Sequence, residues 1–137
     1  MKLAMIVSII AFGTPAAAQR DPGWEVRSPD KLELQPGAAG TLPIAIAVDR
    51  GLTISKDAGL TIDLSGDTGV VIRKRRLGRS DAADPDADGP RFAVPIHADA
   101  AGDYTVKLHI RFWLCGGKVC RPVDTRRTVA VAVHRSE

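Results

Sequence analysis

Apolar and polar residues alternate along much of this chain with a period of two residues, the spacing of a β-strand buried on one face. The pattern is longest at residues 104–115, where every second side chain from Tyr104 to Leu114 is apolar. Residues 129–133 show the same alternation around three valines. We expect these two stretches to form one long β-hairpin that turns at residues 116–119.

Shorter strand patterns precede this hairpin, separated by clusters of Pro, Gly, Asp and Ser. No stretch between them has the 3.6-residue period of an amphipathic helix. Short strands at this spacing predict an all-β fold, an immunoglobulin-like antiparallel β-sandwich. Residues 77–90 instead have the composition of a long loop. The shorter strands are expected at residues 24–28, 31–35, 41–48, 60–64, 69–74 and 91–97.

The first 18 residues have the three parts of a secretory signal peptide. Lys2 supplies a positive charge, residues 3–12 form an apolar run, and residues 16–18 are the small residues of a cleavage site. The apolar run is too short to span a bilayer. We therefore expect a signal peptide at residues 1–18 and one exported domain at residues 19–137 that is not inserted in the membrane.

Charge and composition argue against a nucleic-acid partner. The chain has 19 Lys and Arg and 16 Asp and Glu, a net charge of +3 at pH 7, and only 4% aromatic residues. Nucleic-acid-binding proteins concentrate basic residues on one face and add aromatic side chains that stack on bases. Here the basic residues are spread over several segments.

The two cysteines, Cys115 and Cys120, flank the predicted turn. A two-residue type II′ turn with Gly117 at its first central position would place them opposite each other, in a non-hydrogen-bonded pair with Cα atoms about 4.5 Å apart. That separation is near the lower limit of the roughly 4.4–6.8 Å usual for a disulfide. A bond closing so small a loop contributes only about 2 kcal/mol through chain entropy. Such a disulfide would stabilise the fold little and would be easily reduced.

The residues around the cysteine pair leave two interpretations open. Lys118 and Arg121 adjoin the pair, and His109 and Arg111 share the strand face of Cys115. Nearby positive charge favours the thiolate, which is the nucleophile in thiol–disulfide exchange. The other interpretation is an inert structural bond, a common fate of cysteines in exported proteins.

A resemblance to a known family rests on the run FWLCGGKVCRP at residues 112–122 and on the preceding FAVPI at residues 92–96. Over residues 91–133 the chain resembles the N-terminal periplasmic domain of DsbD-type thiol:disulfide interchange proteins. The resemblance implies an immunoglobulin-like fold in the periplasm and transfer of reducing equivalents from a membrane-embedded thiol reductase to thioredoxin-like proteins. It also implies that Cys120 forms the mixed disulfide with the partner and that Cys115 resolves it.

The family shields its cysteines with a cap loop that carries an aromatic residue. The counterpart here would be residues 73–90, which contain no Phe, Tyr or Trp. The full reductases also have a membrane core and a thioredoxin-like domain, for which this sequence has no counterpart. The expected activity is therefore that of the periplasmic module.

Other patterns in the chain favour ordinary structure over a site. Residues 84–89 resemble the start of a calcium-binding EF-hand loop, but its twelfth position is Pro95 instead of a bidentate Glu. The basic run at residues 73–76 is expected to be a solvated strand edge. Trp24 and Trp113 are expected to be packing residues, although Trp113 lies on the cysteine face and could shield the thiols.

A metal site would need histidines beside the two thiolates. Of His97, His109 and His134, only His109 shares a strand face with Cys115, and six residues at about 3.3 Å each put it roughly 20 Å away. The sequence thus favours a monomeric, cofactor-free thiol:disulfide exchange module. The alternatives are a non-catalytic binding or interaction domain with a structural hairpin disulfide and, less favoured, a carrier of zinc or copper(I).

Overall fold

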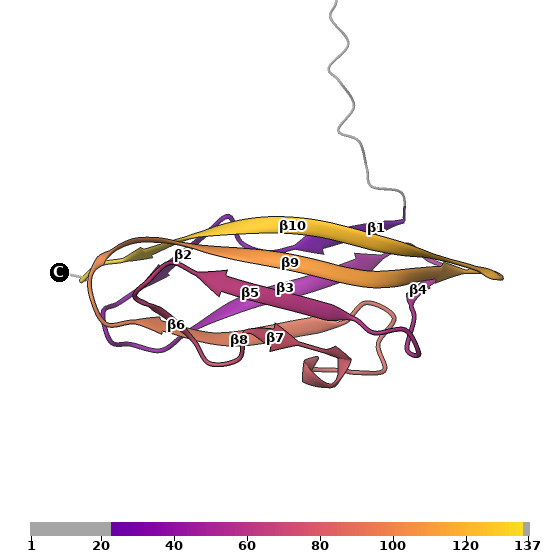
Figure 1. The fold of residues 1–137 in the computed structure, drawn as a ribbon, viewed down its shortest axis with the longest axis horizontal. Helices are drawn as coiled ribbons and strands as arrows, with labels where there is room; N and C mark the ends of the chain where they lie inside the picture. Colours follow the sequence, from indigo (N-terminus) through magenta and orange to yellow (C-terminus); the bar gives the residue numbers. More distant parts are fainter. Residues whose placement is uncertain (1–22, 136–137) are drawn as a thin grey trace, which may run out of the picture.

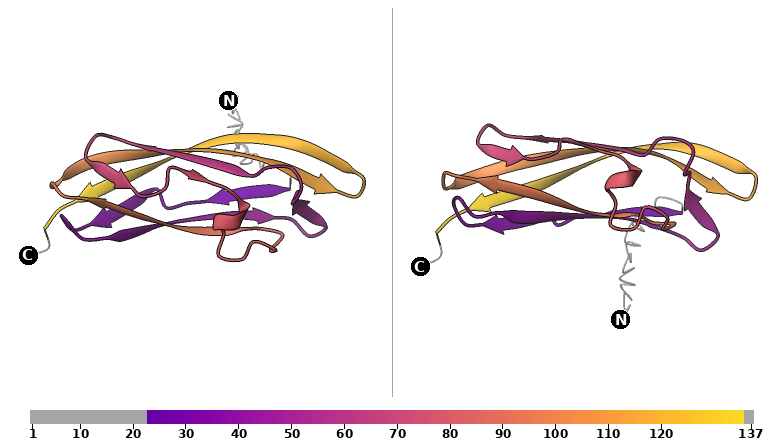
Figure 2. Two further views of the ribbon diagram at one scale, coloured as in Figure 1. Left: turned by 60° about the horizontal axis from the view of Figure 1, so that its bottom comes forward. Right: turned by 90° about the horizontal axis from the view of Figure 1, so that it is seen from below.

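Two β-sheets face each other across one apolar core in the computed structural model, which describes residues 23–135 (Figures 1 and 2). The predicted signal peptide lies outside the described residues. Among residues 23–135 there is no α-helix, as expected. The first sheet has the strand order β1 (Trp24–Arg27), β3 (Gly40–Val48), β8 (Arg91–Ala98) and β6 (Val70–Ile72).

The second sheet contains the long hairpin. The strand β4 (Leu52–Ile54) joins this sheet by pairing with the hairpin's first strand. The remaining strands follow the order β2 (Lys31–Leu34), β10 (Val119–Val133), β9 (Gly102–Gly116), β5 (Thr61–Gly66) and β7 (Arg76–Leu77).

This topology is that of an immunoglobulin-like sandwich. The first sheet has the order of the A, B, E and D strands, and the second places β10, β9 and β5 as G, F and C. β7 pairs with β5 at the edge of the second sheet and follows β6 in the chain. The opening strands β1 and β2 are divided between the sheets, and β2 runs parallel to β10. The predicted fold class is therefore confirmed.

The two-residue alternation explains how the hairpin packs. In β9 the even-numbered residues from Val106 to Leu114 are at most 2% exposed, and the odd-numbered residues face outward. On the inner face Phe112 meets Trp24 of the opposite sheet edge-on, with ring centroids 5.7 Å apart. Burial of these side chains holds the hairpin on the sandwich.

Tyr104, near the start of β9, ties the loop before it to the sheet. Its hydroxyl donates to the carbonyl oxygen of Ala100 at 2.8 Å. This is the position and bonding of the tyrosine corner found in immunoglobulin-like domains. The bond anchors the end of the hairpin that lies farthest from its turn.

The structure contains elements that the strand pattern did not predict. β4 was not expected, and residues 77–90, expected to be one loop, begin with the end of β7 and include a 3-10 turn at Arg79–Asp81. β6 is shorter than the predicted strand at residues 69–74. The basic residues that follow Ile72 are exposed and cannot continue an alternation of buried side chains.

Replacing Tyr104 with Phe is expected to lower the free energy of unfolding by about 1 kcal/mol, because the ring stays and one hydrogen bond is lost. Urea unfolding followed by Trp fluorescence measures the change. An unchanged unfolding midpoint would contradict a structural role for this hydroxyl.

Candidate functional site: a disulfide at the hairpin tip

The tip of the β9–β10 hairpin has the predicted turn and register. Gly116 pairs with Val119, and Cys115 with Cys120. Gly117 has a φ of 59°, whereas no described residue other than glycine has a positive φ. This combination matches a type II′ turn, which needs a positive φ only at its first central residue. The turn therefore places the two cysteines directly opposite each other.

Cys115 and Cys120 form a disulfide across the tip. Their Cα atoms are 4.0 Å apart, closer than the predicted 4.5 Å and below the roughly 4.4 Å at which the usual range for disulfides begins. The bond spans a sequence separation of only 5 residues. It lies beyond the buried core, at the end of the ribbon that projects furthest from the sandwich, opposite the C-terminal end (Figure 1).

The two cysteines differ in their access to solvent. Cys120 is exposed, whereas Cys115 is half-buried. Cys115 lies between two strands, because Thr53 of β4 pairs with it on the side away from Cys120. At Cys120 the described part of the chain gives β10 a neighbouring strand on one side only, since β2 pairs with β10 only from Ala130 onward. An external thiol can therefore approach Cys120 more easily than Cys115.

Exposed apolar side chains lie on both faces of the hairpin near the disulfide. Trp113 is 41% exposed and pairs with the exposed Pro122 on the outer face, which also carries both cysteines. Val119, the first residue after the turn, is 70% exposed. Trp24 packs against the core, as predicted for a packing residue, whereas Trp113 is exposed because none of the described residues forms a second layer over this face.

The strand β4 borders Cys115 and is held tightly against the tip. A side-chain carbon on either Gly23 or Gly116 would collide with Leu52, so Leu52 lies directly over the backbone of both glycines. Residues 73–90 were expected to provide any cap, but β4 is the segment that pairs with Cys115. The sequence signal that could have predicted β4 is the short run Leu52–Ile54, in which two of the three residues are β-branched.

The charged loop after β7 is hydrogen-bonded to β4. Arg79 donates to the carbonyl oxygens of Ala87 in the loop and Ile54 in β4, at 2.8 and 3.1 Å. Thr53 donates its hydroxyl hydrogen to Asp88 at 3.1 Å. The loop is therefore tied to the strand that lies beside Cys115.

An Arg79→Gln variant is expected to lose about 2 kcal/mol of unfolding free energy, because several carbonyl oxygens lose a charged donor. Arg75→Gln is the matched control, since the Arg75 side chain is exposed and its replacement should change stability by less than about 0.5 kcal/mol. Chemical denaturation measures both, and equal stabilities for the two variants would contradict the bracing role of Arg79.

Two basic residues expected to favour the thiolate are engaged elsewhere. Arg111 donates to Asp63 at 3.0 Å, and the ring nitrogen Nε2 of His109 lies 2.7 Å from Asp124. A hydrogen bond from Arg76, with smaller effects from Arg111, holds the pKa of Asp63 below its ordinary value. The expectation that Arg111 and His109 act on the thiols is therefore not supported. Both side chains contact carboxylates on the outer sheet face.

The histidines are not gathered around the cysteines. His97 is in β8 of the other sheet, and His134 follows β10 at the end far from the turn. Among residues 23–135 no three His, Cys, Asp or Glu side chains are placed to hold a metal ion. Within the same part of the chain, no helix has the length and apolar character to cross a membrane.

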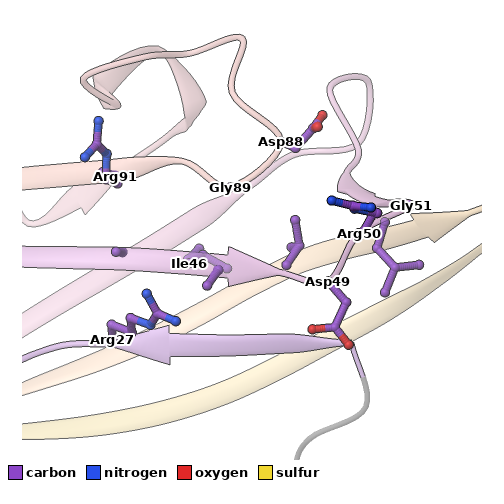
Figure 3. Close-up of a pocket in the computed structure, with 12 residues that line it drawn as sticks. Arg27, Ile46, Asp49, Arg50, Gly51, Asp88, Gly89 and Arg91 are labelled. Carbon is purple, nitrogen blue, oxygen red and sulfur yellow. The ribbon is translucent and has the colours of Figure 1, made fainter.

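A hollow of about 390 Å³ lies beside β3, and neither cysteine lines it (Figure 3). Its charged lining residues carry both signs, and the side chain of Arg91 points away from that of Arg27 in Figure 3. These residues do not converge on one point where a ligand could be held. The charged side chains at its wall are Arg27, Asp49, Arg50, Asp88 and Arg91.

Comparisons with known proteins give only distant structural likenesses. No protein-family model matches the chain, and no curated protein matches it. A PapD-like domain of human CEP192 is similar with a TM-score of 0.46 and 11% identity, over 100% of this chain and 99% of that one. Murine CRIg gives 0.45 and 9%, over 82% and 98%. An alpha-2-macroglobulin from E. coli gives 0.43 and 13%, over 80% of this chain but only 6% of that one.

Proposed function

We propose that this protein is an exported thiol:disulfide exchange module whose working group is the Cys115–Cys120 pair. Its partners would be a membrane-embedded thiol reductase on one side and periplasmic thioredoxin-like proteins on the other, in agreement with the resemblance to DsbD-type domains. The observation that carries the proposal is an exposed disulfide at the end of a projecting hairpin, with Cys120 on an open strand edge.

The weak structural contribution of this disulfide supports the proposal. Closing so short a loop stabilises a folded chain by only about 2 kcal/mol. The hairpin is already held by its buried face, including Ile110, Phe112 and Leu114, each at most 2% exposed. The bond can therefore open without removing what keeps β9 and β10 in place.

The exchange chemistry needs only sulfur atoms from the two proteins. In one half-cycle a partner thiolate attacks Sγ of Cys120, the Cys115–Cys120 bond breaks, and Cys115 leaves as a thiolate that takes up a proton. A second partner thiolate then displaces Cys120, leaving the partner oxidised by two electrons and this protein reduced. In the other half-cycle the Cys120 thiolate attacks a partner disulfide, and Cys115 resolves the mixed disulfide.

The exposed residues at the tip would serve docking in this function. Trp113 and Pro122 form an apolar surface on the face that carries the sulfurs. Aromatic side chains are enriched where proteins contact each other. A partner that rests on this surface would bring its own sulfur to Cys120.

The same apolar surface also supports a second candidate, a non-catalytic interaction domain whose hairpin carries a structural disulfide. In that case the tip would bind a partner through Trp113 and Pro122, and the sulfurs would never exchange. The two functions differ in whether a free thiol at Cys120 forms a covalent bond with a partner.

Single-cysteine variants separate these functions. In Cys115→Ala the exposed Cys120 is expected to form a mixed disulfide with an oxidised thioredoxin-like protein at least about tenfold faster than Cys115 does in Cys120→Ala, because access limits the exchange rate. Non-reducing electrophoresis over time measures both rates. Circular dichroism of the two variants verifies that each is folded.

No mixed disulfide with either variant would sink the exchange function and favour the interaction domain. Equal rates for the two variants would contradict the assignment of Cys120 as the attacking residue. The double variant, with both cysteines replaced by Ala, gives the background of the assay.

A further inference from the structure

Within residues 23–135, no strand covers the outer edge of β10 next to Cys120. β2 pairs with β10 only at Ala130–Val133, and no described strand pairs with the outer edge from Val119 to Val129. An uncovered strand edge presents unpaired N–H and C=O groups that can bind another strand. The free edge therefore begins at the reactive end of the hairpin.

The strand period determines which residues turn their backbone groups toward this edge. Ala130 donates its N–H to the carbonyl oxygen of Asp30, on the outer side of β10. Because the backbone direction repeats every two residues, the even-numbered residues from 120 to 128 face the same side. The bonding of Trp113, which lies opposite Pro122, agrees with this assignment. The carbonyl oxygen of Trp113 accepts a hydrogen bond from the N–H of Ser55, so the backbone groups of Trp113 point away from β10. Those of Pro122 therefore point away from β9, toward the free edge. Cys120 thus presents its own N–H and C=O at the free edge.

We infer that the exchange partner binds by adding an extended segment antiparallel to this edge, with its cysteine directly opposite Cys120. The inference rests on the proposed exchange function and specifies how the partner is recognised. Such pairing gives backbone hydrogen bonds for affinity and positions the side chains on alternate faces. The partner's sulfur would then lie on the same face as Sγ of Cys120.

The expected Cα separation lies within the range for a disulfide across the edge. Since Cys120 turns its backbone groups outward, a residue opposite it would form a hydrogen-bonded pair, with Cα atoms about 5.5 Å apart. That value is the commonest for disulfides, whereas the internal pair is at 4.0 Å. The mixed disulfide can therefore form at a more ordinary separation than the bond that it replaces.

Pro122 and the turn define which part of the partner pairs. β10 begins directly after the turn at Gly117 and Lys118, so the partner segment can follow the edge only from Cys120 toward Asp124. Because the pairing is antiparallel, the partner residues along this part of the edge are those that precede its cysteine. Pro122 faces the edge without an N–H and offers only its carbonyl oxygen. Basic residues dominate the strand here, with one acidic residue among residues 118–127, so an acidic or neutral segment fits best.

The chemical step on this edge is the exchange described above. The segment's thiolate bonds to Sγ of Cys120, the Cys115–Cys120 bond breaks, and Cys115 receives the electron pair and then a proton. The backbone pairing raises the rate at which the thiolate reaches the sulfur. It does not change which bonds form and break.

Synthetic peptides test the inference on the unaltered oxidised protein. The probe is an acidic nonapeptide of Glu, Thr and Val residues with one cysteine near its C-terminus. In one version the backbone nitrogens of the second and fourth residues before the cysteine are methylated. In the paired segment the N–H groups of these two residues would face β10, so methylation removes their hydrogen bonds to the edge. The matched control is N-methylated at the first and third residues, whose N–H groups would face solvent. Quenched mass spectrometry measures the rate of mixed-disulfide formation, with glutathione as a small thiol that cannot pair with an edge.

The version methylated on the inner side is expected to react at least about fivefold more slowly than the control, because two hydrogen bonds to the edge are lost. If glutathione opens the disulfide and the two methylated peptides react at equal rates, edge pairing is overturned while the exchange function stands. If neither glutathione nor any peptide opens the disulfide, the exchange function and the inference both fail.

Discussion

The register of one two-residue turn determines the chemistry that this protein can perform. With Gly117 and Lys118 in the turn, the cysteines on either side must lie opposite each other, and their outer-face position follows from the same pairing. A shift of one residue would move every side chain of one strand to the other face, placing a cysteine against the core and a core residue outside. The buried face of β9, from Val106 to Leu114, prevents that shift.

The core and the disulfide have separate tasks in this arrangement. The sandwich buries a continuous set of Val, Leu, Ile and Phe side chains, while no polar or charged residue among those described is buried. The cysteines lie past the end of this core, where β4 pairs with Cys115 and the loop held by Arg79 is bonded to β4. The structure therefore holds one sulfur between strands and exposes the other, and the state of the bond changes the stability of the fold by only about 2 kcal/mol.

Much of the fold could be predicted because the alternation is strong where both sheets bury one face. The long hairpin, its turn type and the opposition of Cys115 and Cys120 followed from local pattern and turn geometry. β4 could not be found so easily, because three residues are too few for a periodic signal and it forms through tertiary pairing with β9. The pairing of Arg111 with Asp63 was likewise hidden, since it joins strands that are distant in sequence.

The exposure of Trp113 could not be predicted from its residue type, which more often packs inside a protein. The alternation correctly placed it on the outer face, but only the structure reveals that none of residues 23–135 forms a layer above it. The result is an apolar surface beside a reachable disulfide, at the point where the edge of β10 becomes free. The hairpin tip that carries these features lies at one end of the molecule (Figure 1).

The central claim is that the Cys115–Cys120 bond exchanges readily with external thiols. Its equilibrium reduction potential, measured by alkylating free thiols after equilibration in glutathione and dithiothreitol buffers, tests this most directly. An exchange pair is expected above about −300 mV, in the range of the known disulfide oxidoreductases. A potential below about −300 mV would identify a structural bond and contradict the account.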